Sequence, residues 1–426
     1  MKAIGIDIGT TSICGIVIDL DTGDIIKSRT ENSNAFLSGS AEWEKIQSVE
    51  KIIGRSTEIL DSLIEKGVVS IGVSGQMHGM VYIDSRGNAL SPLYTWQDGR
   101  GNLPYKDATY ASFLGSFSGY GNVTDFYNRE NGIRPKNAVS YCTIHDYFVM
   151  RLCGLEKPQI HASNAQSFGL YDIEKNCFSY DFSPETVNEY KIAGRYKNIP
   201  VSVAIGDNQA SVFSTLASDG DILINVGTGS QVSVISDTPI RAENIETRPY
   251  FEGKYLIVGS ALCGGRAYSV LKSFYTQVFG YVTSVNDDTV YDIMDKMLES
   301  EVSSSLSVDT RFAGTRSNPS LSGCISGINT ENLTPENLTR GVLAGMTEEL
   351  YEMYGKMGVT RRKIVGSGNG IRKNRHLINA IEKTFGKKLI IPRHLEEAAF
   401  GAALFALISC GKYKNAKEAQ NIIKYL

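Results

Sequence analysis

Two short turns rich in hydroxyl side chains are prominent, one near the N-terminus and one near the midpoint of the chain. The first reads Gly9-Thr10-Thr11-Ser12 and the second reads Gly227-Thr228-Gly229-Ser230, each between β-branched segments. Such a turn gathers backbone N–H groups and hydroxyls into a nest that binds anions. Because unrelated turns rarely share both their hydroxyls and their flanking strands, we predict a duplicated fold that holds a polyphosphate between its halves. This is the plan of an ATP-dependent transferase, although neither turn continues as a Walker loop.

Two aspartates lie at the ends of predicted strands, where a carboxylate can meet bound phosphate. Asp207 follows an apolar strand and precedes a helix, so it fits two compatible roles, helix N-cap and general base for an attacking hydroxyl. Asp7 precedes the first turn and fits either a buried hydrogen-bonding residue or, more readily beside phosphate, a ligand of magnesium and its water. We therefore predict Asp207 as the catalytic residue and both aspartates as metal ligands.

A set of polar and aromatic residues in the first half fits the binding of a polyol, which needs donors and acceptors for its hydroxyls and an aromatic face for its C–H surface. The candidates are Gln76, Met77, His78, Trp96, Asp98 and Arg100. Each alone would be a core or surface residue, and His78 could be a buried histidine with satisfied hydrogen bonds. The segment 72–76 is not a nucleophile elbow, because Gln76 replaces its last glycine, so a serine hydrolase is disfavoured.

A glycine-rich stretch late in the chain, Gly366-Ser367-Gly368-Asn369-Gly370, has two interpretations. It is not a dinucleotide-binding fingerprint, because Ile371 stands where the third glycine is required. It could let a flat base lie against the backbone, or it could simply connect a strand to a helix.

Hydrophobic periodicity places these residues on an α/β framework. Three short strands at 3–8, 13–20 and 24–29 precede an amphipathic helix from Trp43 to Ile64, with Gly67 as its C-cap, and a strand at 68–73. An irregular stretch at 95–189 contains one clear helix, at 143–152. The order of strands and helix then recurs from Ile222. This order predicts a duplicated actin-like, ribonuclease H-like fold with a nucleotide cleft between two domains.

The second half has further signals. A gap near 217–221 predicts domains at 1–217 and 218–426. Thr334-Pro335-Glu336 predicts the start of a helix, with threonine as N-cap and proline at the first helical position. The small residues at 398–408 predict a helix that can approach a sheet closely.

Composition argues against several classes of protein. The net charge is −3 and charged residues make up 21%, so no global positive field attracts nucleic acid. The longest apolar run, at 398–408, is far shorter than the roughly 20 residues of a spanning helix, and Asp7 interrupts any secretory h-region. The seven cysteines contain no C-x-x-C pair, which is typical of reduced thiols. We expect a cytoplasmic protein with no nucleic-acid or membrane partner.

These motifs resemble the FGGY family of carbohydrate kinases. The resemblance rests on segments 7–12, 206–209, 227–229 and 366–368, which follow the family's order over essentially the whole chain. Segments 73–79 and 95–100 resemble several ketose kinases, and 143–155 is more particular to kinases of sedoheptulose; Asn164-Ala165 and Asn374 agree with them.

The resemblance implies transfer of phosphate from ATP, with Mg²⁺, to the terminal hydroxyl of a ketose, most favourably sedoheptulose to sedoheptulose 7-phosphate. Asp207 is implied as the proton acceptor. The implied nucleotide contacts are Thr10, Thr11, Ser12, Gly227, Thr228, Gly314, Gly368 and Asn369. The implied sugar contacts are Met77, His78, Trp96, Asp98 and Asn208. The chain is short for the family, and Ile13 and Cys14 stand where a basic residue usually clamps phosphate.

Two alternatives stay open. One is a kinase of xylulose or another short ketose or polyol, because one extra CHOH changes discrimination only modestly. The other is an actin-like, nucleotide-driven clamp or sensor that turns over no sugar. The polar set at 76–78 and 96–100 favours an enzyme, since a clamp does not need it. A homodimer is compatible with either interpretation.

Overall fold

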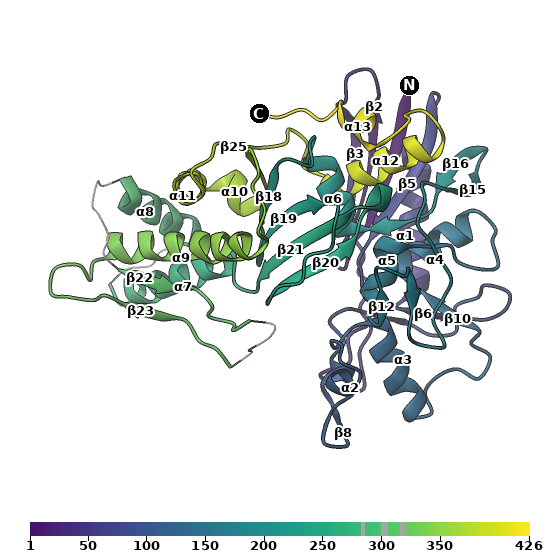
Figure 1. The fold of residues 1–426 in the computed structure, drawn as a ribbon, viewed down its shortest axis with the longest axis horizontal. Coiled ribbons are helices and arrows are strands. Elements are labelled where there is room, and N and C mark those ends of the chain that lie inside the picture. Colours follow the sequence, from purple (N-terminus) through teal and green to yellow (C-terminus); the bar gives the residue numbers. More distant parts are fainter. Residues whose placement is uncertain (283–285, 300–305, 316–317, 319) are drawn as a thin grey trace. The chain divides into compact units, whose positions relative to one another are not determined.

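The computed structural model describes residues 1–282, 286–299, 306–315, 318 and 320–426, which form two compact units (Figure 1). The first unit comprises Met1–Ala217, Arg248–Lys254 and His394–Lys424, and the second comprises Ser218–Thr247, Tyr255–Arg393 and Tyr425–Leu426. The division at 217/218 coincides with the predicted boundary. Two later segments differ from the predicted 218–426 domain because they return to the first unit, where helix α12 (Glu397–Ser409) packs on the sheet.

A mixed sheet forms the centre of the first unit, in the order β15-β16-β5-β1-β2-β3, with β17 also paired to β5. The first three strands form an antiparallel meander, whereas β5 runs parallel to β1, and β16 and β17 run parallel to β5. The bounds are β1 Lys2–Ile8, β2 Ser12–Asp19, β3 Ile25–Asn32, β5 Val68–Gly75, β15 Ile192–Tyr196, β16 Ile199–Ser202 and β17 Ile205–Gly206. The residues that end β1, β5 and β17 therefore meet at one edge of the sheet.

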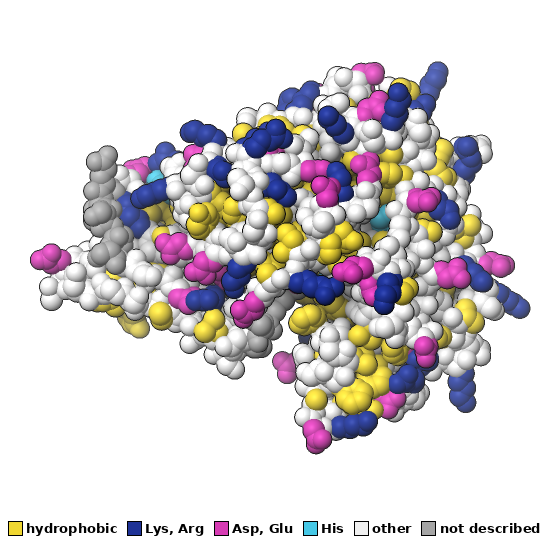
Figure 2. All heavy atoms as spheres, in the orientation of Figure 1, with side chains coloured by type: hydrophobic (Ala, Val, Ile, Leu, Met, Phe, Trp, Pro, Cys, Tyr) yellow, Lys and Arg dark blue, Asp and Glu magenta, His cyan; other side chains and the backbone are white. Residues whose placement is uncertain are grey.

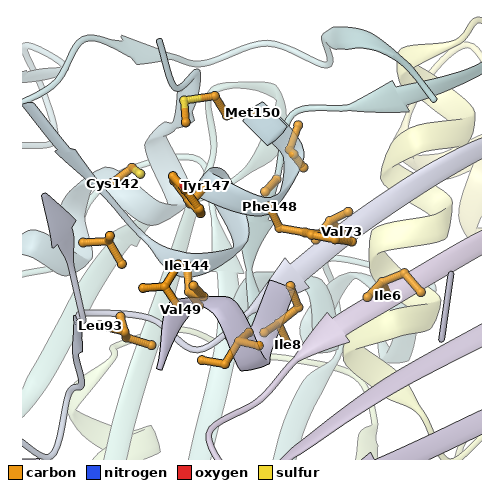
Figure 3. Close-up of a cluster of buried hydrophobic side chains, with 14 of the residues drawn as sticks. Ile6, Ile8, Val49, Val73, Leu93, Cys142, Ile144, Tyr147, Phe148 and Met150 are labelled. Atoms are coloured by element: carbon orange, nitrogen blue, oxygen red, sulfur yellow. The ribbon is translucent and has the colours of Figure 1, made fainter. Parts of the chain in front are cut away.

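Helix α1 (Val49–Leu63) covers one face of this sheet, and Ser48 caps it by accepting a hydrogen bond from the Lys51 N–H at 3.2 Å. Side chains alternate across a strand, so the isoleucines at 4, 6 and 8 point to this face. They join a continuous buried core with residues of α1, β5 and the insertion, part of which Figure 3 shows. Each such side chain contributes roughly 1.5–3 kcal/mol through burial.

Helix α12 covers the opposite face at very short range, which agrees with the predicted close approach of its small residues. A Cβ atom on Gly5 would lie 1.8 Å from the carbonyl oxygen of Ala399, and one on Gly72 would lie 1.9 Å from that of Ala402. Gly401 meets α6 (Asp207–Thr215) in the same way, since its Cβ would lie 1.9 Å from the Ala210 oxygen. Only glycine permits these contacts.

The second unit repeats this plan with a sheet in the order β20-β21-β19-β18-β24-β25. β18 and β19 form an antiparallel hairpin, β21 continues it antiparallel, and β24 runs parallel to β18, as β5 does to β1. The duplication predicted from the two turns is confirmed. The bounds are β18 Ile222–Val226, β19 Ser230–Ser236, β20 Ile245–Pro249, β21 Tyr255–Ala261, β24 Ile364–Ser367 and β25 Leu389–Ile390.

Helices of the second unit surround its core. They are α7 Gly265–Gly280, α8 Asp287–Glu299, α9 Pro335–Lys356, α10 Asn369–Lys373 and α11 Arg375–Phe385. Thr334 caps α9 through a hydrogen bond from the Asn337 N–H, and Pro335 is the first helical residue, which confirms the predicted start. A small hairpin of β22 (Ser307–Asp309) and β23 (Cys324–Ser326) lies beside α9.

Residues between β5 and β15 form an insertion with more helix than its sequence indicates. Its helices are α2 Tyr110–Phe113, α3 Gly121–Glu130, α4 Ile144–Leu152 and α5 Ala162–Ala165, with 3₁₀ turns at Gly99–Asn102 and Gln166–Phe168. β6 (Val81–Ile83) pairs antiparallel with the distant β10 (Ser140–Cys142). Two short hairpins pair β8 (Pro104–Tyr105) with β9 (Ala108–Thr109) and β12 (Tyr171–Asp172) with β13 (Cys177–Phe178). β11 (Ile160–His161) runs parallel to β14 (Thr186–Val187), and α13 (Ala416–Gln420) follows α12.

Two predictions about the first helix are wrong. It begins at Val49 rather than Trp43, because Ile46–Gln47 forms strand β4 and pairs with β7 (Leu93–Tyr94). It also ends with Ile64 as its C-cap, while Gly67, at φ +94°, lies in the turn that leads into β5.

Candidate active site

Asp7 and Asp207 come together at one edge of the first sheet because their strands flank the same residue of β5. Asp7 is the register partner of Ser74 on one side, and Ile205, two residues before Asp207, is its partner on the other. The Ser74 hydroxyl donates a hydrogen bond of 2.8 Å to Asp7 Oδ1. The carboxylates lie near enough for the charge of Asp7 to raise the pKa of Asp207.

Burial is the main influence on both carboxyl groups. It raises the pKa of Asp207 to about 7, with repulsion from Asp7 second, while the Asn208 backbone N–H and Arg248 oppose the rise. Burial likewise raises the pKa of Asp7 to about 6, opposed by the Ser74 hydrogen bond and assisted by Glu396. A carboxyl with a pKa near neutrality is suited to accept a proton from an alcohol.

The position of Asp207 between a strand and a helix had indicated an N-cap role, but Asp207 is not the N-cap of its helix. Gly206 is the N-cap and makes no side-chain cap bond, and Asp207 is the first residue of α6. Asp207 Oδ1 accepts a hydrogen bond of 2.7 Å from the N–H of Asn208. Arg248, buried at 4% exposure, donates from Nη1 to Asn208 Oδ1 at 3.0 Å and so places a cation beside the Asp207 carboxyl.

The first hydroxyl turn is tied to the polyol candidates by a relay of hydrogen bonds. Trp96 Nε1 donates to Thr10 Oγ1 at 2.9 Å, and Thr10 Oγ1 donates to Gln76 Oε1 at 3.2 Å. Gln76 Nε2 donates to Gln47 Oε1 at 3.0 Å, and Gln47 Nε2 donates to the Thr10 carbonyl oxygen at 2.7 Å. Thr11 is exposed and Ser12 is partly exposed at the start of β2. Asp7 lies beside this turn, since a Cβ on Gly9 would be 3.9 Å from Asp7 Oδ2.

His78 is held in a specific orientation next to Met77. Its ring stacks on Tyr120 with centroids 4.3 Å apart, and its Nδ1 lies 2.9 Å from the Ser167 carbonyl oxygen. A carbonyl only accepts, so Nδ1 of His78 is the donor in this hydrogen bond. Met77 is buried, and its sulfur would lie 2.8 Å from a Cβ on Gly206, which puts the Met77–His78 loop against the residue before Asp207.

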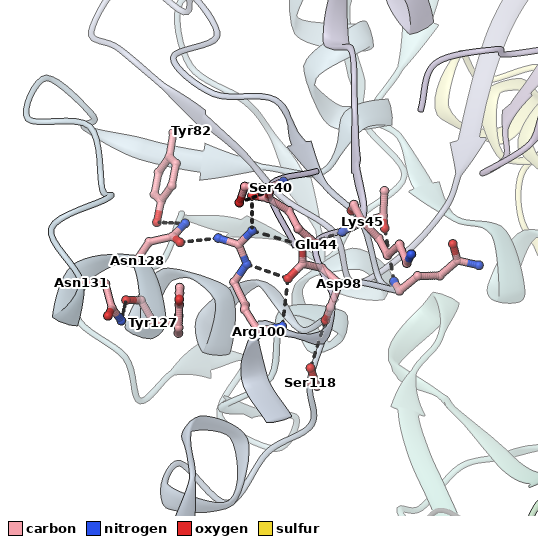
Figure 4. A network of polar contacts seen from close by, with 12 residues as sticks. Ser40, Glu44, Lys45, Tyr82, Asp98, Arg100, Ser118, Tyr127, Asn128 and Asn131 are labelled. Carbon is pink, nitrogen blue, oxygen red and sulfur yellow. Dashed lines mark hydrogen bonds and ion pairs between the residues drawn. The ribbon is translucent and has the colours of Figure 1, made fainter. Parts of the chain in front are cut away.

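Asp98 and Arg100 form a buried pair, each 1% exposed, rather than an open binding surface (Figure 4). Asp98 Oδ1 accepts from the Arg100 N–H and Nε, and Oδ2 accepts from the Lys45 N–H and Arg100 Nη2. These four bonds use the acceptor positions of the carboxylate. Arg100 also donates to Asn128 and lies 4.2 Å from the ring centroid of Tyr94. The carboxylate oxygens of Asp98 are thus taken up by contacts within the chain, and a substrate-binding role for Asp98 and Arg100 stays a prediction.

The second hydroxyl turn closes the β18–β19 hairpin at the edge of the second sheet. The Gly227 N–H donates to the Gly229 oxygen at 2.9 Å, while the N–H groups of Gly265 and Arg266, in the first turn of α7, donate to the oxygens of Gly227 and Thr228 at 2.9 and 3.0 Å. A Cβ on Gly264 would lie 2.3 Å from Gly229. The start of α7 therefore packs directly on the turn and leaves Thr228 exposed.

The late glycine stretch lies at the same edge of the second sheet. Ser367 ends β24 and accepts a hydrogen bond of 2.7 Å from Asn225 Nδ2 on β18. Gly368 has φ +84°, and a Cβ there would lie 2.5 Å from the Val226 oxygen, so glycine is needed; Asn369 begins α10. Gly314 also has a positive φ, +68°, and the backbone of the two residues before it faces the thiol of Cys263, which lies two residues before α7.

Several residues at the first site escape sequence analysis. Gln47, Arg248 and Ser167 each contact a predicted site residue that is distant along the chain, and Ser163 contacts Gly206, the residue before Asp207. Asn164 belongs to the segment that carries the family resemblance, which is an indirect signal for its neighbours Ser163 and Ser167. Arg248 and Gln47 have no such signal.

The donor set at Asp7 and Asp207 fits a magnesium ion, which prefers oxygen ligands and keeps several waters and phosphate oxygens. Within the described part of the chain, no group of three or more histidine, cysteine, aspartate or glutamate side chains is arranged to hold a metal ion. Two carboxylates therefore suit a magnesium ion whose other ligands are water and the phosphate oxygens of a nucleotide.

Figure 2 shows basic and acidic side chains interspersed over the face in view, without a large patch of one sign. Among the helices of the described residues, none has the length and apolar character needed to cross a membrane.

Comparison with protein families matches both halves of the chain. Residues 2–105 match the N-terminal domain of the FGGY family of carbohydrate kinases, and residues 222–410 match the C-terminal domain. The two matches together cover well over half of the 426 residues.

Individual relatives agree over nearly the full length. The chain is 29% identical to a sedoheptulokinase of Mus musculus, over 95% of this chain and 97% of that protein, and 28% identical to that of Homo sapiens, over 98% of each. A xylulose kinase of Rhodospirillum rubrum has a similar structure, with a TM-score of 0.86 at 18% identity, covering 100% of this chain and 93% of the other. Gluconate kinase of Lactobacillus acidophilus gives 0.85 at 17%, covering 100% and 92%. These structures confirm the predicted fold.

Proposed function

The chain belongs to the FGGY family of carbohydrate kinases, and from this premise we propose that it transfers phosphate from ATP to the terminal hydroxyl of a ketose, with sedoheptulose as the favoured substrate. The observation that carries the proposal is the position of Asp207, a partly exposed residue beside the Met77–His78 loop, where desolvation raises the pKa of its carboxyl to about 7. Similarity to the two sedoheptulokinases over nearly the full chain supports the choice of sugar.

Asp207 is the proposed general base. Phosphoryl transfer to an alcohol needs little covalent help from the protein beyond positioning, charge stabilisation and acceptance of the hydroxyl proton. His78 and Asn208 are the proposed ligands of the sugar hydroxyls near Asp207, and their contacts with the Ser167 carbonyl and with Arg248 support this assignment. Trp96, 47% exposed, offers an aromatic face for the C–H surface of the sugar.

The nucleotide is proposed to use both hydroxyl turns. In the first unit, Thr10, Thr11 and Ser12 supply hydroxyls and backbone N–H groups to the phosphates. In the second unit, Gly227 and Thr228 do the same, and Gly314, Gly368 and Asn369 are the proposed contacts of the adenosine part. Asp7 and Asp207 would hold Mg²⁺, which neutralises phosphate charge when bound. Arg248, which donates to Asn208, also supplies a positive charge close to Asp207, and the family resemblance does not predict this residue.

The substrate assignment is tested by measuring ADP release with a panel of ketoses, aldoses and glycerol. We expect the highest kcat/KM on sedoheptulose, lower values on pentuloses and poor activity on aldoses. The Asp207→Asn variant and a reaction without sugar give the background ATPase rate. A clear preference for xylulose or glycerol would move the assignment within the family, and no ADP release with any polyol would favour a nucleotide-driven clamp.

A further inference from the structure

A short buried segment of the first unit, His161–Phe168, contacts the chain on both sides of the proposed acceptor site. It consists of the last residue of β11, helix α5 and the following 3₁₀ turn. The side chains of Ser163, Asn164 and Ser167 are all 0% exposed. One of them contacts the strand end that precedes Asp207, another contacts His78, and the third anchors the segment.

Ser163 holds the backbone just before Asp207. Its Oγ accepts a hydrogen bond of 3.2 Å from the N–H of Gly206, the N-cap of α6, and donates to His161 Nδ1 at 2.9 Å. Burial lowers the pKa of His161 to about 3, so its ring stays neutral, and because the Ser163 N–H donates to Nδ1 at 3.1 Å, Nδ1 is the acceptor nitrogen. The Ser163 carbonyl also accepts from Gln209 Nε2 at 3.4 Å. These contacts fix the residues on both sides of Asp207.

Ser167 holds His78 in the same manner. Its Oγ accepts a hydrogen bond of 3.1 Å from the His78 N–H and donates one of 2.6 Å to the backbone carbonyl oxygen of Asn164. The Ser167 carbonyl oxygen accepts from His78 Nδ1. His78 has φ +73°, a left-handed backbone conformation that is strained for a non-glycine residue and must be held by its surroundings. Ser167 supplies that restraint.

Asn164 anchors the segment to the 143–155 region. Its Nδ2 donates to Asp146 Oδ1 at 3.1 Å and to the Ala204 oxygen at 3.3 Å, and its Oδ1 accepts from His145 Nε2 at 2.9 Å. The Thr143-Ile144-His145-Asp146 motif thus lies behind the site and fixes the segment that contacts it.

We propose that Ser163 and Ser167 are positioning residues with separate tasks, Ser163 for Asp207 and Ser167 for His78. The inference rests on the proposed function, because it assigns the base to one contact and a sugar ligand to the other. The two hydroxyls are equally buried, lie four residues apart, and each accepts from one backbone N–H and donates within its own segment. Removing either one deletes the same atom, so a difference in kinetics reports what each one positions.

The test compares Ser163→Ala and Ser167→Ala on the full chain. Ser163→Ala should lower kcat roughly 10-fold with the sugar KM within about two-fold, since a small displacement of a base costs rate rather than binding. Ser167→Ala should raise the sugar KM roughly 10-fold with kcat within about two-fold. Amide hydrogen exchange, which needs no turnover, should accelerate at Gly206 in the first variant and at His78 in the second.

Ser70→Ala is the matched control, because Ser70 on β5 is 0% exposed and its hydroxyl has no hydrogen-bond partner among the described residues. It should leave kcat, KM and both amides unchanged. If both test variants change kcat and KM alike, in proportion to their melting temperatures, or if neither changes them, the inference is overturned while the kinase assignment stands. A wild-type protein that phosphorylates no ketose would overturn the proposed function first.

Discussion

The indole N–H of Trp96 donates a hydrogen bond to Thr10 Oγ1 across 2.9 Å, joining a predicted sugar contact to the first hydroxyl turn. The Thr10 hydroxyl in turn donates a hydrogen bond to Gln76 Oε1. Residues predicted for two different ligands therefore share one polar connection. Positions 10 and 96 lie in separate loops, so the connection exists only in the folded chain.

Trp96→Phe keeps an aromatic face but removes the indole donor. Because a neutral hydrogen bond contributes about 0.5–1.5 kcal/mol, we expect the KM for ATP to rise roughly 3- to 10-fold, in addition to any effect on the sugar. Thr10→Val removes the acceptor, and steady-state kinetics of both single variants and the double variant measure the coupling. Strictly additive effects would show that the contact carries no energy between the two sites.

Asp207→Asn removes the proposed base and retains the shape of the side chain. We expect kcat to fall by roughly 10²–10⁴, the usual contribution of general-base catalysis, with the affinities for sugar and ATP within a few-fold. Since Gly206 is the N-cap and burial raises the pKa of Asp207, the neutral amide should leave the melting temperature unchanged or slightly higher. Near-normal turnover combined with a lower melting temperature would instead assign Asp207 a structural role.

Asp98→Asn should act on stability rather than on sugar binding. It leaves the buried Arg100 guanidinium with only the longer, 3.5 Å ion pair to Glu44, and breaking a buried pair typically costs about 3–5 kcal/mol. Urea unfolding measures the loss, and the KM for sugar of the folded fraction should stay within about two-fold. Asp61→Asn, which removes an exposed ion pair with Lys197, is the control and should be nearly neutral. If Asp98→Asn instead raised the KM for sugar without lowering the free energy of unfolding, Asp98 would be a sugar-binding residue.

Asp146→Asn should change how stability depends on pH. Burial raises the pKa of Asp146 to about 7 in the folded chain, against about 3.9 in an unfolded one. The folded state therefore holds a proton that the unfolded state has released, and the free energy of unfolding falls as pH rises from about 4 to about 7. In Asp146→Asn the free energy of unfolding does not fall for this reason. Its stability relative to the wild type should therefore grow by a few kcal/mol as pH rises over that range and then level off.

Chemical denaturation at pH 5, 6, 7 and 8 checks this expectation. The neighbouring His145, whose burial lowers its pKa to about 4, titrates in both proteins and cancels from the difference. Asp172→Asn is the control: backbone N–H groups of Lys175 and Glu174 hold the pKa of this exposed carboxyl below its usual value, so it should not alter the slope above pH 5. A pH-independent difference for Asp146→Asn would contradict the assignment.

The sequence alone is enough to predict the repeated plan of the fold. The β-branched runs on either side of each hydroxyl turn are local signals, and they became the β1–β2 and β18–β19 hairpins. Thr334-Pro335 marked the start of α9 for the same reason, because a helix start depends on a few consecutive residues. The family followed from motifs that are themselves short and contiguous.

Tertiary structure decided what those motifs contact. Asp98 and Arg100 are adjacent to a predicted sugar contact in sequence, yet their side chains satisfy each other in a buried pair, which no local pattern reveals. Helix α12 belongs to the first unit because Gly5 and Gly72, hundreds of residues earlier, leave room for it against the sheet. Gln47, Arg248, Ser163 and Ser167 reach the site through hydrogen bonds between distant segments. Spacing along the chain predicts elements, whereas burial and hydrogen-bond pairing depend on which elements the fold brings together.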